Sequence, residues 1–106
     1  MAKSDSFCDF VVDQLGDLGA LTVRRMFGGF GIYREDVFFA IVQDAALYFK
    51  TDDSTRAEYV RRGMGPFRPN EKQTLWSYYQ VPVELIEDAE GLCDWARKAV
   101  ACQQEK

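Results

Sequence analysis

The amino-acid sequence predicts a two-layer α+β domain, in which an antiparallel sheet of about five to six strands is packed with helices. Apolar residues recur at helical spacing near both ends of the chain. Between them, short runs rich in aromatic and β-branched residues are separated by connections too short for parallel crossovers, so neighbouring strands should be antiparallel. The chain has 106 residues, 47% of them apolar, and we expect a single domain over residues 1–106.

The first element should be an amphipathic helix over residues 4–18 that ends at Gly19. Three aspartates spaced four residues apart form its solvated side: Asp9, Asp13 and Asp17. Five apolar side chains fall on another face: Phe7, Phe10, Val11, Leu15 and Leu18.

Four strands should follow, at residues 21–27, 30–34, 37–42 and 46–50. Glu35 and Asp36 leave room for only a two-residue hairpin turn between the second and third strands. The third strand is apolar throughout, which predicts a central strand that is covered on both faces.

The second half of the chain predicts a short helix, two strands and a final helix. The short helix spans residues 54–62 and is closed by Gly63, and residues 67–69 form an edge strand that contains a proline. Residues 75–81 form the last strand, and residues 82–88 could hold one helical turn. Asp88 caps the last helix, whose apolar stripe is Leu92, Trp95, Ala96, Ala99 and Val100.

Large aromatic side chains should form most of the core. Seven of them are candidates: Phe10, Phe27, Phe30, Phe39, Phe49, Trp76 and Trp95. Cys8 and Cys93 lie on apolar stretches and should be small buried residues, whereas Cys102 should be exposed.

Composition excludes several classes of function. The chain has no histidine, so every Ser-His or Cys-His dyad and the commonest zinc ligand are absent. No catalytic residues, metal ligands or cofactor-binding residues stand out, and we expect a non-enzymatic protein. No membrane span or signal peptide is visible, which favours the cytoplasm. The net charge of −4 argues against direct DNA binding by this chain alone.

The segment from Arg24 to Gly31 is unlike ordinary helix or strand sequence, and we interpret it as the corner at which the sheet begins. Its structural motif is Met26, Phe27, Gly28, Gly29 and Gly31, in which the glycines permit a bend or a close approach of two strands. The G-x-G it contains lacks the third glycine and the following helix of a dinucleotide site. Arg24 and Arg25 should point to opposite faces of a strand, where an arginine could pair internally or contact a partner.

One basic segment lies at residues 56–72, where five bases stand against two acids. From it we select Arg61, Arg62 and Arg68 as interaction residues, together with Tyr79 as an exposed tyrosine on the last strand. A solvated surface, a protein interface and a nucleic-acid surface all remain open for this segment.

Five segments together resemble the N-terminal domain of the TfoX/Sxy family, in the family's order. The first is Arg24-Arg25-Met26-Phe27-Gly28-Gly29 with the following Phe30-Gly31-Ile32-Tyr33. The others are Ala46-Leu47-Tyr48-Phe49-Lys50, Gly65-Pro66-Phe67, Ser77-Tyr78-Tyr79-Gln80-Val81-Pro82 and Asp94-Trp95-Ala96-Arg97-Lys98-Ala99. The resemblance covers nearly the whole chain.

This resemblance implies a fold like that of secretion chaperones, and by analogy with them a homodimer. It also implies a role in competence regulation in bacteria, through a protein partner of the cyclic-AMP receptor protein type. The better-known members carry a second, C-terminal domain, and we expect this chain to be a stand-alone N-terminal domain. The family supplies no catalytic residues. The alternative is a small-molecule or anion-binding module that uses the Arg24/Arg25 and glycine corner.

Overall fold

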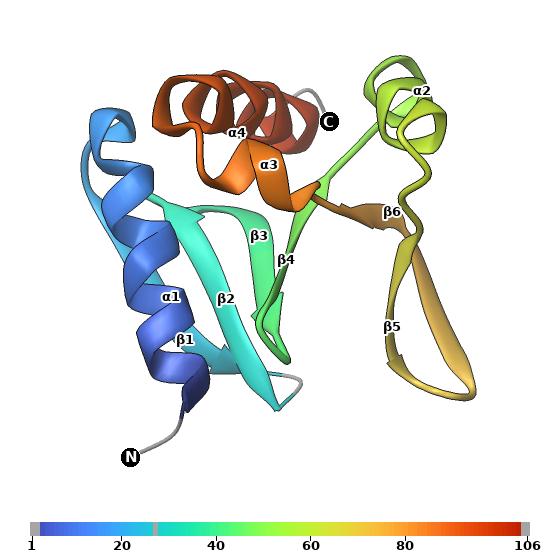
Figure 1. The fold of residues 1–106 in the computed structure, drawn as a ribbon, viewed down its shortest axis with the longest axis horizontal. Coiled ribbons are helices and arrows are strands. Elements are labelled where there is room, and N and C mark those ends of the chain that lie inside the picture. Colours follow the sequence, from blue (N-terminus) through green and yellow to red (C-terminus); the bar gives the residue numbers. More distant parts are fainter. Residues whose placement is uncertain (1–2, 27, 105–106) are drawn as a thin grey trace.

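A computed structural model of the chain describes residues 3–26 and 28–104. The elements follow in the order α1 (Lys3–Gln14), a 3-10 turn (Gly16–Leu18), β1 (Leu21–Met26), β2 (Gly29–Arg34), β3 (Val37–Gln43), β4 (Ala46–Lys50), α2 (Asp53–Arg61), β5 (Pro66–Asn70), β6 (Gln73–Gln80), α3 (Val83–Ile86) and α4 (Ala89–Gln104). Six antiparallel strands form one sheet in the order β1-β2-β3-β4-β6-β5 (Figure 1). The predicted α+β class and the order of helices and strands are confirmed.

Helices α1, α3 and α4 lie together on one side of the curved sheet (Figure 1). The end of α1 is tied to the two later helices, because the Gln14 amide donates to the Ile86 carbonyl at 2.8 Å and the Cys93 thiol donates to the Gln14 carbonyl at 3.5 Å. Asp88 caps α4 as predicted, since its carboxylate accepts a hydrogen bond from the Gly91 amide. These bonds hold α1 and α4 over the same face of the sheet.

Strand β3 is central and covered on both faces, as predicted, but it does not alternate regularly. Ile32 on β2 pairs with Ala40 and Tyr33 pairs with Phe38, so Phe39 is an extra residue in β3. Phe39 and Ala40 therefore both pack in the core beneath the helices, whereas Ile41 packs on the opposite face. This bulge lets a single apolar strand contribute to two cores.

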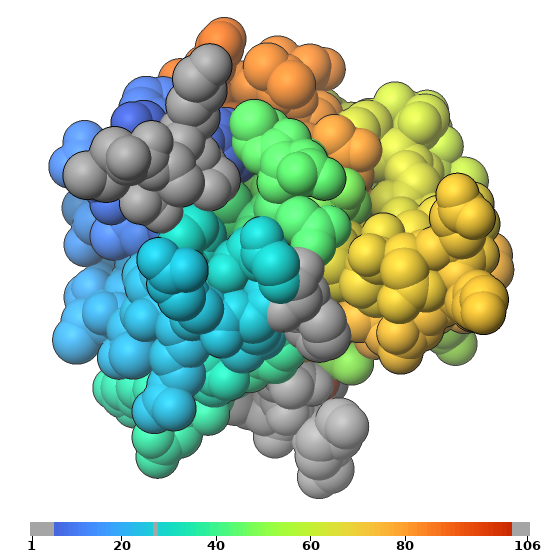
Figure 2. Space-filling view, turned by 90° about the horizontal axis from the view of Figure 1, so that it is seen from below, coloured from blue at the N-terminus to red at the C-terminus, as the bar shows by residue number. Residues whose placement is uncertain are grey.

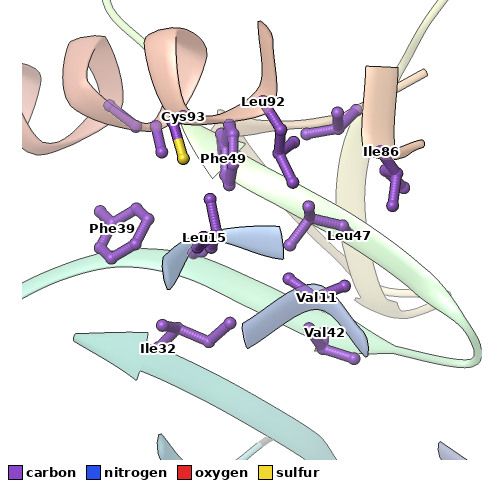
Figure 3. Close-up of a cluster of buried hydrophobic side chains, with 14 of the residues drawn as sticks. Val11, Leu15, Ile32, Phe39, Val42, Leu47, Phe49, Ile86, Leu92 and Cys93 are labelled. Carbon is purple, nitrogen blue, oxygen red and sulfur yellow. The ribbon is translucent and has the colours of Figure 1, made fainter. Parts of the chain in front are cut away.

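The larger core lies between the sheet and the helices. Figure 3 shows Val11 and Leu15 of α1 close to Ile32, Phe39 and Val42 of the sheet, with Leu92 and Cys93 of α4 close to Leu47 and Phe49. The smaller core, on the helix-free face, contains Ile41, Phe67 and Tyr78 with three partly buried neighbours: Phe38, Tyr48 and Leu75. Tyr48 and Phe67 lie 4.7 Å apart between ring centroids, although β4 and β5 are not adjacent, so the sheet is curved towards this face.

Four of the predicted core aromatics agree with the structure. Phe39 and Phe49 are fully buried, and Phe30 and Trp95 pack at the margin of the larger core. Phe27 lies outside the described residues.

Three burial predictions for the core candidates and the cysteines are wrong. Phe10 is 44% exposed, because Cys8, Val11 and Leu15 form the buried face of α1 and Phe10 lies on its flank. Trp76 is 66% exposed, where β6 loses its regular register with β5 and its side chain leaves the packed face. Cys102 is 9% exposed rather than open to solvent, since α4 carries it beside the Thr55 hydroxyl. Apolar spacing identified the elements but not which flank of each element the next layer covers.

The turn between β3 and β4 offers a stability test. Asp44 and Ala45 both have positive φ, 53° and 60°, as in a tight two-residue hairpin that favours Asn-Gly. Because an L-residue pays steric energy in this conformation, we expect Ala45→Gly to raise the free energy of unfolding by about 0.5–1 kcal/mol in urea titrations. Ala57→Gly, in the exposed middle of α2, should lower it by about 1 kcal/mol. A loss of stability in Ala45→Gly would contradict the strain.

In the part of the chain that the structure describes, every helix is too short or too polar to span a membrane.

Candidate functional site: a basic cleft between two helices

Helix α2 is fixed at both ends by its own sequence. Asp52 accepts hydrogen bonds from the Ser54 and Thr55 amides while the Thr55 hydroxyl accepts one from the Asp52 amide, which forms a capping box. Hydrogen bonds, above all from the Ser54 hydroxyl, hold the pKa of the Asp52 carboxyl well below its usual range. At the other end Gly63, with φ of 81°, lets the Met64 amide bond back to the Tyr59 carbonyl. The bases in the last turn of α2 are therefore held in a defined position.

A cleft of about 540 Å³ opens between α2 and α4. Its lining residues, which we call the basic cleft, are Ser54, Thr55, Glu58, Tyr59, Arg61, Arg62, Trp95 and Lys98. Tyr59 and Trp95 form its floor, with ring centroids 4.7 Å apart in an edge-to-face arrangement. Burial raises the pKa of the Tyr59 hydroxyl, so this side chain stays neutral. The floor of the cleft is therefore aromatic and uncharged.

Positively charged side chains surround this aromatic floor. Arg61 and Arg62 both pair with Glu58, at 2.8 and 2.9 Å, and the guanidinium of Arg62 lies 5.2 Å from the centre of the Trp95 ring. The hydrogen bond from Arg62 lowers the pKa of the Glu58 carboxyl, which keeps that group ionised. With Lys98 there are three bases and one acid in the lining, in a chain whose net charge is −4. The cleft can accept carboxylates or phosphates, because one acid cannot neutralise three bases.

The structure separates the basic segment that the sequence predicted as one patch. Arg61 and Arg62 lie in the basic cleft, whereas Arg68 is exposed on β5. Arg56 lies outside the cleft lining and pairs with Asp53 at 2.9 Å. The bases of residues 56–72 therefore do not form one surface.

The prediction that Tyr79 is exposed is wrong. Its side chain is 6% exposed and lies 6.1 Å from Tyr59 between ring centroids, in the core under the helices. Tyr78 packs on the opposite face and is also buried. Both faces of the sheet are covered at this point, so neither tyrosine is available to a partner.

Of the basic cleft, sequence reasoning selected only Arg61 and Arg62, and it missed the side that α4 supplies, Trp95 and Lys98. Both lie on α4, three residues apart and therefore on neighbouring positions of one helix side. The only signal in the sequence was a base next to the apolar stripe. Arg61 and Lys98 are more than thirty residues apart along the chain, and the packing of α4 against α2 brings them to one cleft.

The glycine corner is a structural feature in which the two arginines diverge. Gly28 has φ of 75°, and Gly29 and Gly31 are buried where strands approach closely. Arg24 lies over the Tyr33 ring and Arg25 over the Phe30 ring, and these rings belong to opposite faces. Within the described ranges, no three His, Cys, Asp or Glu side chains gather to hold a metal ion.

Comparison with known proteins gives this chain a family and several relatives. The TfoX N-terminal domain family matches residues 13–103. The chain is 35% identical over 72 residues to "DNA transformation protein TfoX1" of Aliivibrio fischeri, an alignment that covers 66% of this chain and 34% of that protein. It is 30% identical over 92 residues to "DNA transformation protein TfoX" of Haemophilus influenzae, covering 84% of this chain and 41% of that protein.

A third relative is similar over its own length as well. The chain is 29% identical over 101 residues to an uncharacterized 12.7 kDa protein of Spirochaeta aurantia, covering 95% of this chain and 84% of that protein. By contrast, the chain spans about a third to two fifths of the length of the two DNA transformation proteins.

Proposed function

Because the chain belongs to the TfoX N-terminal domain family, we propose that it is a protein-interaction domain that takes part in the control of DNA transformation. In this proposal it acts in the cytoplasm, by contact rather than by catalysis. The names of two relatives supply the process, since both are DNA transformation proteins. The basic cleft supplies the surface.

The observation that carries the proposal is that three basic residues surround the aromatic floor of the cleft, in a chain that is acidic overall. Arginine and tryptophan are the residue types enriched at the centres of protein interfaces. An acidic protein surface fits this cleft, whereas the overall negative charge opposes an approach to bare DNA. We therefore propose that the domain reaches a promoter through a protein partner, of the cyclic-AMP receptor protein type that the family resemblance implies.

We do not extend the proposal to a small-molecule or anion site at the Arg24/Arg25 corner. The two guanidinium groups lie on opposite faces of β1, over different rings, and cannot hold one small ligand between them.

The test is a titration of the purified chain onto a fluorescent competence-type promoter, with and without the cyclic-AMP receptor protein, at about 0.15 M salt. We expect the anisotropy to change only when the receptor is present. The double variant Arg61→Gln/Lys98→Gln removes two of the bases of the cleft and should weaken this effect about tenfold, because two exposed charge pairs of about 0.7 kcal/mol each sum to about 1.4 kcal/mol.

The matched control is Arg56→Gln/Arg97→Gln, which makes the same change of charge on the same two helices outside the cleft. It should titrate like the parent chain. A change without the receptor would contradict action through a partner, and no change in either case would contradict the promoter role. Equal losses in both double variants would remove the basic cleft as the surface.

A further inference from the structure

Strand β1 is the edge strand on one side of the sheet, and its outer edge and most of its side chains are exposed. It pairs with β2 alone, so one of its edges carries no neighbouring strand. Four consecutive residues, 22–25, are exposed, which means that side chains on both of its faces meet solvent. Among the described residues, no loop or cap hydrogen bond reaches the backbone of β1. Such an edge presents alternate amide and carbonyl groups that can pair with another strand.

The other edge of the sheet is closed to pairing. Strand β5 contains Pro66 and Pro69 within five residues, and proline has no amide to donate. Its second residue, Phe67, is fully buried in the smaller core. Figure 2 shows the two edges apart, with β1 and β2 in blue to cyan and the β5–β6 hairpin in yellow. Only β1 combines an unpaired edge with accessible side chains.

Arg24 and Arg25 give this edge its chemistry. Their guanidinium groups lie 5.5 Å from the centre of the Tyr33 ring and 6.0 Å from that of the Phe30 ring, one on each face of the sheet. Four other arginines of the described chain pair with a carboxylate: Arg56, Arg61, Arg62 and Arg97. No described carboxylate lies within 4 Å of Arg24 or Arg25. Stacking restrains the two guanidinium groups while their N–H groups stay available to acids.

We propose that β1 binds an extended acidic segment of a protein partner, which adds to the sheet as a seventh strand. Residues directly opposite one another on paired antiparallel strands project to the same face. Two consecutive acidic residues on the added strand would therefore meet Arg24 on one face and Arg25 on the other. Backbone hydrogen bonds supply affinity, and the two acid–arginine pairs set the register.

The same arginines argue against a second copy of this chain as the added strand in the register centred on them. A two-fold axis between Arg24 and Arg25 would place arginine opposite arginine on both faces, and like charges directly opposite one another destabilise a strand pair. An acidic partner turns this repulsion into attraction. The inference goes beyond the proposed function, because it concerns a surface separate from the basic cleft.

The test uses the fluorescein-labelled peptide Thr-Val-Thr-Glu-Glu-Thr-Val-Thr, with binding to the whole chain followed by fluorescence anisotropy. We expect saturable binding that weakens with salt, and about tenfold weaker binding to Arg24→Gln/Arg25→Gln. Arg61→Gln/Lys98→Gln, with the same change of charge in the basic cleft, should bind the peptide as the parent chain does. These substitutions are on exposed side chains, and circular dichroism checks that each variant is folded.

A pair of N-methylated peptides distinguishes strand addition from simple charge attraction. N-methylation of alternate amides keeps both glutamates but removes the hydrogen bonds of one edge of the peptide. The methyl groups can be placed on the odd-numbered or on the even-numbered amides, and only one of these two peptides should lose binding. Equal binding of the two N-methylated peptides would overturn strand addition. Equal binding of a Gln-Gln peptide, no binding of the Glu-Glu peptide, or loss of binding only in the cleft variant would also overturn the proposal.

Discussion

Replacing Phe39 with alanine is expected to lower the free energy of unfolding by about 3–5 kcal/mol. Phe39 is fully buried at the bulge of β3, with its ring centroid 5.9 Å from that of Phe49. The bulged backbone fixes the side chain beneath the helices, so the surrounding residues cannot easily close the cavity. For a domain of this size the melting temperature should fall by about 15 °C or more, which scanning calorimetry measures directly.

Phe10→Ala is the matched control, because it removes the same atoms from a side chain that is 44% exposed. Its cost should stay below about 1.5 kcal/mol. Equal costs for the two substitutions would contradict the assignment of Phe39 to the core and of Phe10 to the flank of α1.

Replacing Gly29 with alanine should cost about 2–3 kcal/mol, because the new methyl group would collide with the carbonyl oxygen of Val42. That oxygen belongs to the backbone of a central strand, so it cannot move without disturbing the pairing of β2 with β3. Urea titration followed by circular dichroism would give the cost. Gly29 is thus required by the lack of space and not by its own φ.

Two further glycines provide the scale for this experiment. At Gly31 the methyl group would meet only the end of Met26 and the edge of the Phe38 ring, which can shift, so the cost should be smaller. At Gly65 nothing lies within 4 Å, and Gly65→Ala should change stability by no more than about 0.5 kcal/mol. A ranking in which Gly65→Ala costs as much as Gly29→Ala would contradict the close approach of β2 and β3.

Local sequence was sufficient for most of the fold. Helix periodicity, the Asp88 cap and the short turn at residues 35–36 act over a few residues, so they could be predicted without knowledge of tertiary packing. Trp76 could not be placed in the same way, because its exposure follows from a slip in register between β5 and β6. The bulge at Phe39 has the same origin, since it is a property of two paired strands.

The candidate site was only half visible in the sequence. Arg61 and Arg62 stood out as neighbouring bases, but Trp95 and Lys98 reach them through the packing of α4 against α2. Neither the spacing of residues nor their composition shows that α4 packs against α2. The sequence also placed Arg24 and Arg25 on opposite faces correctly, while the openness of β1 became clear only from the order of the strands.

The place of α4 in the chain has a consequence for how the protein is made. α4 lies over the central strands β3 and β4, and it supplies Leu92, Ala96 and Val100 to the larger core. It follows all six strands in chain order, so during synthesis the strands leave the ribosome before the helix that covers them. Until then Phe39 and Phe49 have no cover from α4. The nascent sheet is therefore the stage at which chaperone binding or aggregation would compete with folding.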